Sequence, residues 1–110
     1  MDEQARFEAR VLRSFLRDGR LASIPAQERK RQVILRWLRR TCFVEDRDYP
    51  EKEVNMRLAL VHPDVAALRR YLVEARLMSR ASGLYRPLPL AGSEAAPASG
   101  PTPEEANGAS

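Results

Sequence analysis

Arginine side chains give this sequence its most informative chemistry. Arg69 and Arg70 are adjacent within an otherwise apolar stretch, and Arg80 and Arg86 lie on either side of a Ser-Gly turn signal, close to Tyr85. A guanidinium group stays charged at neutral pH and forms paired hydrogen bonds with phosphate oxygens. These five residues could therefore bind a nucleic-acid backbone, or they could hold the domain together through internal carboxylates.

The distribution of charge is compatible with the first interpretation. Residues 1–90 contain all 19 Lys and Arg residues and all but three of the 15 Asp and Glu residues, which leaves seven more positive than negative charges. A positive domain of this size attracts polyanions, and nucleic acid is the first candidate. A solvated, arginine-rich surface without such a partner would have the same composition, so charge alone leaves both alternatives open.

Two helices are predicted ahead of this cationic region. Apolar residues at helical spacing indicate a helix over residues 2–17, with Asp2 as its cap and Gly19 as its stop. A second helix is predicted over residues 26–42. Its apolar stripe contains Val33, Ile34, Trp37, Leu38, Thr41 and Cys42.

Arg29, Arg36 and Arg40 fall close together on another side of this second helix, with Arg39 nearby. We expect them to form a positive ridge. The ridge would add salt-sensitive, weakly specific phosphate contacts if it shared a face with the later arginines. Trp37 could stack on a base, but it belongs to the apolar stripe and is expected in the core.

The second half of the chain has the outline of a winged helix-turn-helix. A short helix is expected over residues 51–61, and Asp64 would cap a further helix over residues 65–77. Residues 78–88 would then form a β-hairpin. The predicted fold class is therefore mainly α with a C-terminal β-hairpin, in which a winged helix-turn-helix-like core is preceded by two helices.

We expect one domain, residues 1–90, followed by an acidic tail over residues 91–110. The tail consists of small and polar residues rich in Ala, Pro, Gly and Ser. Because it has no large apolar side chain, ordering it would bring almost no burial to offset the lost entropy, and it is predicted to be disordered. Within the domain, Phe43-Val44 fits either a short strand or a buried hook, and Pro50 suits a first helical turn.

Several short motifs between Val11 and Arg86 form a specific combination. They are FLRDGRLASIP at 15–25, KR at 30–31, YPEKEVN at 49–55, DVAALRRYLV at 64–73 and GLYR at 83–86. Together they resemble the bacterial domain of unknown function 2087 family. The resemblance implies a small winged-helix-like domain that occurs alone or behind the helix-turn-helix domain of transcriptional regulators. It implies no mechanism, because the family has no established biochemical activity.

The chain departs from the family pattern at Pro50, where Ser or Thr is usual. This proline removes the hydroxyl half of a capping box with Glu53, which weakens a helix cap without changing the fold.

The predicted recognition helix would present its first residues to the base edges. Residues 64–67 offer an aspartate, a valine and two alanines, none of which forms a bidentate contact with a base. Base reading is therefore expected to be modest, and a mainly structural role for this helix stays open. Because neighbouring helical residues point about 100° apart, Arg69 and Arg70 should differ in role. One is expected to reach Glu51 or Glu53, and the other to face outward.

Two functional hypotheses follow. The first is a DNA-binding or transcription-associated regulator that docks on double-stranded DNA through the helix at 65–77 and the wing at 78–88. Its candidate DNA-binding residues are Arg69, Arg70, Arg80, Arg86, Tyr85, Arg36 and Arg40. The second is a non-catalytic protein-interaction or ligand-sensing module that partners a separate regulator protein without binding DNA itself. Under the first hypothesis, a homodimer would double the contact with DNA. The first hypothesis requires guanidinium groups on the wing that are not all committed to internal carboxylates.

Catalysis, a metal and a cofactor are not expected, because the sequence has no glycine-rich phosphate loop, no nucleophile motif and a single histidine. His62 and Cys42 lack the spacing of metal ligands and are predicted to be structural. A lone cysteine suits a reducing compartment. The chain also has no secretory signal and no run approaching the ~20 apolar residues of a membrane span. A cytoplasmic location without a membrane partner is therefore expected.

Overall fold

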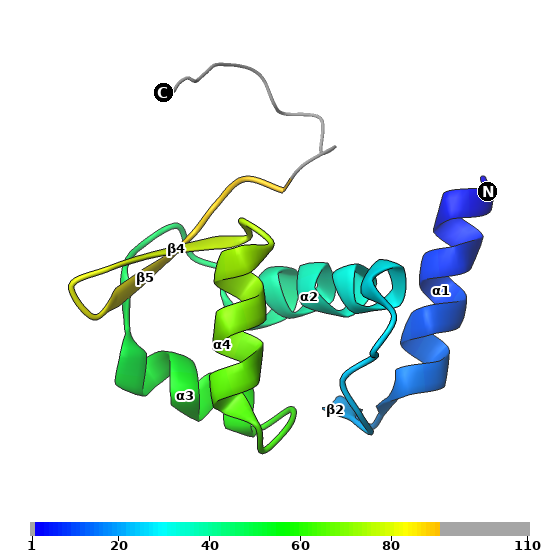
Figure 1. Ribbon diagram of the computed structural model, residues 1–110, viewed down its shortest axis with the longest axis horizontal. Coiled ribbons are helices and arrows are strands. Elements are labelled where there is room, and N and C mark those ends of the chain that lie inside the picture. The colour runs from blue at the N-terminus through cyan, green and yellow to red at the C-terminus, as the bar shows by residue number, and fades with distance from the viewer. Residues whose placement is uncertain (1, 91–110) are drawn as a thin grey trace.

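The structure of the protein, a computed structural model, describes residues 2–90 (Figure 1). Within these residues the chain forms four helices and five short strands. The helices are α1 (Glu3–Phe15), α2 (Glu28–Cys42), α3 (Glu51–Ala59) and α4 (Val65–Glu74). The strands are β1 (Leu16–Arg17), β2 (Arg20–Leu21), β3 (Tyr49–Pro50), β4 (Met78–Ala81) and β5 (Leu84–Pro87). The predicted class, mainly α with a C-terminal β-hairpin, is confirmed. The predicted tail at 91–110 lies outside the described residues.

The first helix is shorter than predicted. Asp2 caps α1 as expected, because its side chain accepts a hydrogen bond from a backbone N–H of the first turn. The prediction of helix through residue 17 is wrong, because β1 pairs with β2 in an antiparallel ladder. Asp18 and Gly19 connect the two strands with φ angles of 54° and 77°. An Asp-Gly pair is favoured in such a turn, so the glycine interpreted as a helix stop belongs to a hairpin.

Helix α2 lies between α1 and α4 and supplies much of the core (Figure 1). Its buried residues are Val33, Ile34, Leu35 and Leu38. Leu35 was not predicted to be buried, and Trp37, which was expected in the core, is partly buried and packs against it. The helix meets neighbours on more than one side, so its buried surface does not follow a single stripe.

Helices α3 and α4 follow one another through a turn at residues 60–64, in the predicted order. Asp64 caps α4, because its carboxylate accepts a hydrogen bond from the backbone N–H of Ala67. The apolar sides of the two helices face inward, where Val54 and Leu58 of α3 and Leu68 of α4 are fully buried. This packing leaves the opposite side of α4 available to solvent.

Helix α4 ends at Glu74, three residues before the predicted end. Arg76 has a φ angle of 60°, which lies in the left-handed region and stops the helix. The N–H of Arg76 donates to the carbonyl of Val73, and the N–H of Leu77 donates to the carbonyl of Leu72. These two bonds are those of a Schellman motif, in which glycine usually takes the left-handed position. An arginine in that place gives the sequence no visible stop signal.

The predicted hairpin forms around Ser82-Gly83 and gains a third strand, giving the sheet order β3-β5-β4. Tyr49 pairs with Tyr85, and the N–H of Glu51 donates to the carbonyl of Gly83 at 3.1 Å. Strand β3 was not predicted. Its Pro50 lacks an N–H, as is tolerated in an edge strand. Before β3, Phe43 is fully buried while Val44 is exposed. Of the two predictions for this pair, the buried hook, in which a loop side chain inserts into the core, is confirmed, and the short strand is wrong.

A single cluster of buried side chains joins all these elements. It extends from Val11 of α1 to Tyr85 of β5, and Phe43 and Tyr49 meet within it edge to face at 5.2 Å. None of the helices in residues 2–90 is long and apolar enough to cross a membrane.

Candidate nucleic-acid interface

A groove of about 480 Å³ separates the outer side of α4 from the β4–β5 hairpin. Its lining residues on α4 are Ala66, Arg69, Arg70, Val73 and Glu74. On the other wall, Arg80 and Tyr85 occupy paired positions of the hairpin. Four of the seven predicted site residues are thus brought together on one surface, three arginines and a tyrosine.

Glu51 connects the walls of this groove. Its carboxylate accepts a hydrogen bond from the Tyr85 hydroxyl at 3.2 Å, and it lies 3.7 Å from a guanidinium nitrogen of Arg80 and 3.9 Å from one of Arg69. The position of Glu51 follows from the backbone, because this residue leaves β3 and begins α3 directly beside the hairpin tip. One carboxylate therefore gathers donors from α4, β4 and β5.

The two adjacent arginines have different environments. Arg69 is only 20% exposed, and it donates a hydrogen bond to the side-chain oxygen of Asn55 on α3 in addition to its pairing with Glu51. Arg70 is 59% exposed, and its guanidinium lies 3.9 Å from the carboxylate of Glu74 in the next turn of its own helix. The expected division of roles is present: Arg69 reaches Glu51, and Arg70 faces outward.

Arg86 lies on the other face of the hairpin. Because side chains alternate along a strand, Arg86 points away from its neighbour Tyr85 and from the groove. Its guanidinium is 3.3 Å from a carboxylate oxygen of Asp46 and 3.3 Å from one of Asp48. These pairs are at the surface, since Arg86 is 47% exposed and Asp46 is 84% exposed.

Arg36 and Arg40 of α2 belong to a different part of the molecule. Arg36 donates a hydrogen bond to Glu8 of α1 at 3.0 Å. Arg40 also acts electrostatically on Glu8, whose pKa is lowered first by a hydrogen bond from Gln4 and then by Arg36. Figure 1 shows α1 and the hairpin on opposite sides of the molecule. Arg36 and Arg40 of the expected positive ridge therefore face α1 and are not continuous with the groove, whereas Arg39 donates a hydrogen bond to the carbonyl of Leu88, after β5, at 3.0 Å.

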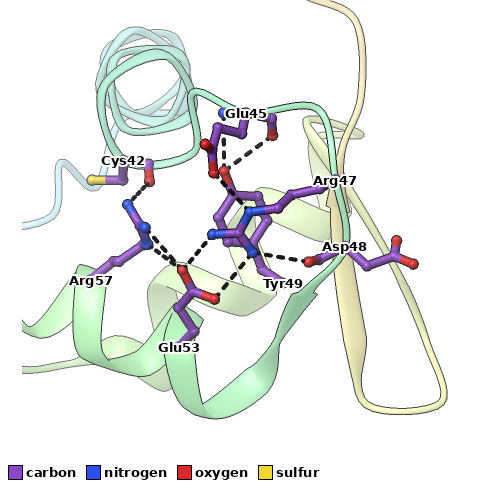
Figure 2. Close-up of polar contacts among 7 residues, drawn as sticks. All are labelled: Cys42, Glu45, Arg47, Asp48, Tyr49, Glu53 and Arg57. Atoms are coloured by element: carbon purple, nitrogen blue, oxygen red, sulfur yellow. Dashed lines mark hydrogen bonds and ion pairs between the residues drawn. The ribbon is translucent and has the colours of Figure 1, made fainter.

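A second polar cluster holds the loop before β3 against α3 (Figure 2). The Glu53 carboxylate lies between two guanidinium groups, at 2.7 Å from Arg47 and 2.9 Å from Arg57. Arg47 also lies over the ring of Tyr49, 3.9 Å from its centroid, while the Tyr49 hydroxyl donates to the carbonyl of Glu45. Arg57 extends the cluster to the C-terminal end of α2 by donating to the carbonyl of Cys42 at 3.0 Å.

These contacts favour the charged forms of the partners. The pKa of Glu53 is lowered mainly by the hydrogen bond from Arg47 and then by the one from Arg57. The Arg47–Glu53 hydrogen bond also raises the pKa of Arg47. The cluster fixes the loop that carries Asp46 and Asp48 and the strand that leads into Glu51. The Arg47–Glu53–Arg57 cluster therefore stabilises elements next to the groove but does not line it.

His62 and Cys42 have local structural contacts. The Nδ1 atom of His62 accepts a hydrogen bond from the backbone N–H of Asp64, at the start of α4. Burial raises the pKa of the Cys42 thiol, which keeps it protonated at neutral pH. Across residues 2–90 there is no group of three or more His, Cys, Asp or Glu side chains placed to hold a metal ion.

Val73 and Glu74 line the groove and were not predicted from the sequence, whereas Ala66 was expected among the first residues of the helix. Val73 and Glu74 follow Arg69 and Arg70 by four residues, and this spacing places them on the same side of α4. That spacing was a usable signal. The Arg47–Glu53–Arg57 cluster was also missed, and no pattern in the sequence indicates it, because it depends on how the loop folds back over α3.

Comparison with known proteins identifies a family but no characterised relative. The model of a family described as "uncharacterized protein conserved in bacteria (DUF2087)" matches residues 20–86, more than half of the chain. No curated protein and no solved structure matches. The matched region begins at β2, leaves out α1 and covers α2, α3, α4 and the entire hairpin apart from Pro87. The chain is therefore a member of the bacterial DUF2087 family.

Proposed function

We propose that this protein binds double-stranded DNA through the groove between α4 and the β4–β5 hairpin, as a transcription-associated regulator of the bacterial cytoplasm. The observation that carries the proposal is the position of Arg70 and Arg80 on opposite walls of one groove, each more than half exposed. The order of helix, turn, helix and hairpin in residues 51–87 resembles a winged helix-turn-helix. In that fold the second helix approaches the bases, and arginines on α4 and on the hairpin would hold the phosphates.

The carboxylates near these arginines do not prevent such binding. Glu74 is 3.9 Å from Arg70, and Glu51 is 3.7 Å from Arg80, and all four side chains are partly exposed. Exposed ion pairs of this kind contribute only about 0–1 kcal/mol. A phosphate group can therefore replace the carboxylate at either arginine, with counterion release from DNA favouring the exchange.

Base reading is expected to be weak. The exposed residues nearest the start of α4 are Asp64 and Ala66, of which the first repels phosphate and the second can only touch an apolar group such as a thymine methyl. Affinity would then come from the backbone and depend strongly on salt. A homodimer that doubled the number of phosphate contacts would raise it.

A salt titration tests this proposal. Binding of a fluorescent duplex of about 20 base pairs is followed by anisotropy between about 50 and 200 mM salt for the wild type and an Arg70→Ala/Arg80→Ala variant. The variant should bind more weakly, with a slope of log K against log salt that is shallower by about 1–2 units. An Arg10→Ala/Arg13→Ala variant, which removes two exposed arginines of α1, is the matched control. Equal affinities of the two variants would contradict the proposed site.

One observation favours the second candidate, a protein-interaction module that does not bind DNA. Met56 and Leu60 of the α3 region are 62% and 72% exposed, although both are large and apolar. They lie together beside Glu53 and Arg57 in a shallow hollow. A folded wild-type protein that binds no duplex at about 50 mM salt would favour this candidate over the DNA-binding one.

A further inference from the structure

The Glu51 carboxylate lies at the edge of the groove, next to donors that line both of its walls. Its carboxylate is within 3.9 Å of donors on Arg69, Arg80 and Tyr85, which come from three different elements. Two guanidinium groups and a phenol around one anionic group are also a suitable set of donors for a phosphate oxygen. The side chain is 38% exposed, so the carboxylate meets solvent at the edge of the groove and does not lie beneath it.

The three donors depend on Glu51 to different extents. Arg69 is also held by Asn55, and Tyr85 is buried in the sheet. Arg80 has Glu51 as its only carboxylate partner within residues 2–90, and its guanidinium lies 5.8 Å from the centroid of the Tyr85 ring. Removal of the negative charge at residue 51 would therefore leave Arg80 as the donor most available to an incoming anion.

We infer that Glu51 sets the affinity of the groove, acting as a built-in competitor for the phosphodiester backbone. This inference rests on the proposed function. With Glu51 in place, a phosphate must displace a carboxylate that is covalently part of the protein and always present. A ligand with several phosphates in a row gains contacts at Arg70 as well and can complete the exchange, whereas a single phosphate gains too little. Glu51 therefore directs the groove toward polymeric backbones and away from inorganic phosphate.

The test compares Glu51→Gln with the wild type and with Glu28→Gln. The amide of the Glu51→Gln variant keeps the size of the original side chain and removes its charge. Glu28 is an exposed glutamate in the first turn of α2 and lacks a side-chain partner in the described part of the chain. Glu28→Gln therefore removes one negative charge from the start of a helix, as Glu51→Gln does, without breaking a side-chain contact. Duplex affinity is measured by anisotropy at several salt concentrations, and thermal unfolding of each variant establishes that it is folded.

Glu51→Gln should bind the duplex about 3–10 times more tightly than Glu28→Gln, with a salt slope steeper by about 1 unit because one more cation meets the backbone. Inorganic phosphate should compete better against the duplex in Glu51→Gln than in the wild type. If the wild type binds the duplex and the affinity of Glu51→Gln is equal to or lower than that of Glu28→Gln, the inference is overturned while the proposed function stands. If neither the wild type nor Glu51→Gln binds any duplex, both fail together.

Glu51→Asp keeps the measurement decisive if Glu51→Gln does not fold. The shorter side chain retains its charge at the start of α3 and withdraws the carboxylate from Arg80. Its duplex affinity should lie above that of the wild type. An affinity equal to that of the wild type would mean that the contacts of Glu51 have no effect on binding, and would overturn the inference.

Discussion

Arg69 of α4 donates a hydrogen bond to the side-chain oxygen of Asn55 on α3, fourteen residues earlier in the chain. This bond ties α3 to α4 through polar groups, in addition to the apolar core that contains Leu58 and Leu68. Its neighbour Arg70 takes no part in it. Two consecutive arginines therefore have separable roles, one in the packing of the helices and one at the surface of the groove.

The first prediction separates these roles by stability. Arg69→Ala leaves Asn55 without its donor and should lower the free energy of unfolding by about 1–3 kcal/mol. Arg70→Ala should change it by no more than about 0.5 kcal/mol, as is usual for an exposed residue. Urea denaturation followed by circular dichroism measures both. Equal losses in the two variants would show that the contacts of Arg69 add no more to stability than those of the exposed Arg70.

The second prediction concerns the Arg47–Glu53–Arg57 cluster and pH. Arg47, and then Arg57, lower the pKa of Glu53 in the folded protein. A lowered pKa means that the cluster stabilises the fold fully above the pKa of a glutamate in the unfolded chain, about 4.3. The stabilisation is lost as the pH falls through the lower, folded-state value.

Glu53→Gln should therefore melt at a lower temperature than the wild type at about pH 7, and the difference should shrink as the pH is lowered toward about 3. Glu28→Gln, which removes an exposed carboxylate outside the cluster, is the control and should show a small difference at both pH values. A Glu53→Gln deficit that is the same at both pH values would show that charge is not its cause.

The third prediction follows from the left-handed residue that ends α4. Arg76 has a φ angle of 60°, which a glycine adopts without a steric penalty. Arg76→Gly should therefore raise the free energy of unfolding by up to about 1 kcal/mol, because the strain relieved in the folded state exceeds the entropy added to the unfolded chain. Arg13→Gly, within α1, should lower it by about 1 kcal/mol. Chemical denaturation of the two variants gives the comparison.

The fourth prediction ranks the two arginines of the hairpin. Arg80 faces the groove, whereas Arg86 lies on the opposite face and pairs with both Asp46 and Asp48. Arg80→Ala should therefore weaken duplex binding more than Arg86→Ala at the same salt concentration. Anisotropy titrations of the two single variants measure this difference. A greater loss in Arg86→Ala would place the interface on the other face of the hairpin.

The order of helices and the C-terminal hairpin could be predicted because their signals are local. Helical periodicity marks α2 and α4, Asp64 marks a helix start, and Ser82-Gly83 marks a turn in which both residues have positive φ. The two-residue strands β1, β2 and β3 could not be found in this way. They are too short to show an alternating pattern. Strand β3 forms because tertiary contacts bring it beside β5, whereas β1 and β2 pair across the Asp18-Gly19 turn, whose glycine was interpreted as a helix stop.

The candidate site could be predicted in composition but not in arrangement. The sequence indicated Arg69, Arg70, Arg80 and Tyr85, which the structure brings to one groove. It also suggested Arg86, Arg36 and Arg40, which the structure places elsewhere. Strand alternation could have separated Arg86 from Tyr85 beforehand. The separation of the α2 arginines could not have been foreseen, because it depends on α1 packing across them.

The hydrogen bond from Glu51 to Gly83 has a consequence for the movement of the hairpin. The hairpin is attached at its tip by this bond and along β5 by the ladder to β3, as well as through the chain at its base. Because the β4–β5 hairpin is held at both its tip and its base, we expect it to keep its position relative to α4. We therefore expect the groove to keep its width, and under the proposed function a bound DNA backbone would have to fit that width without the hairpin closing around it.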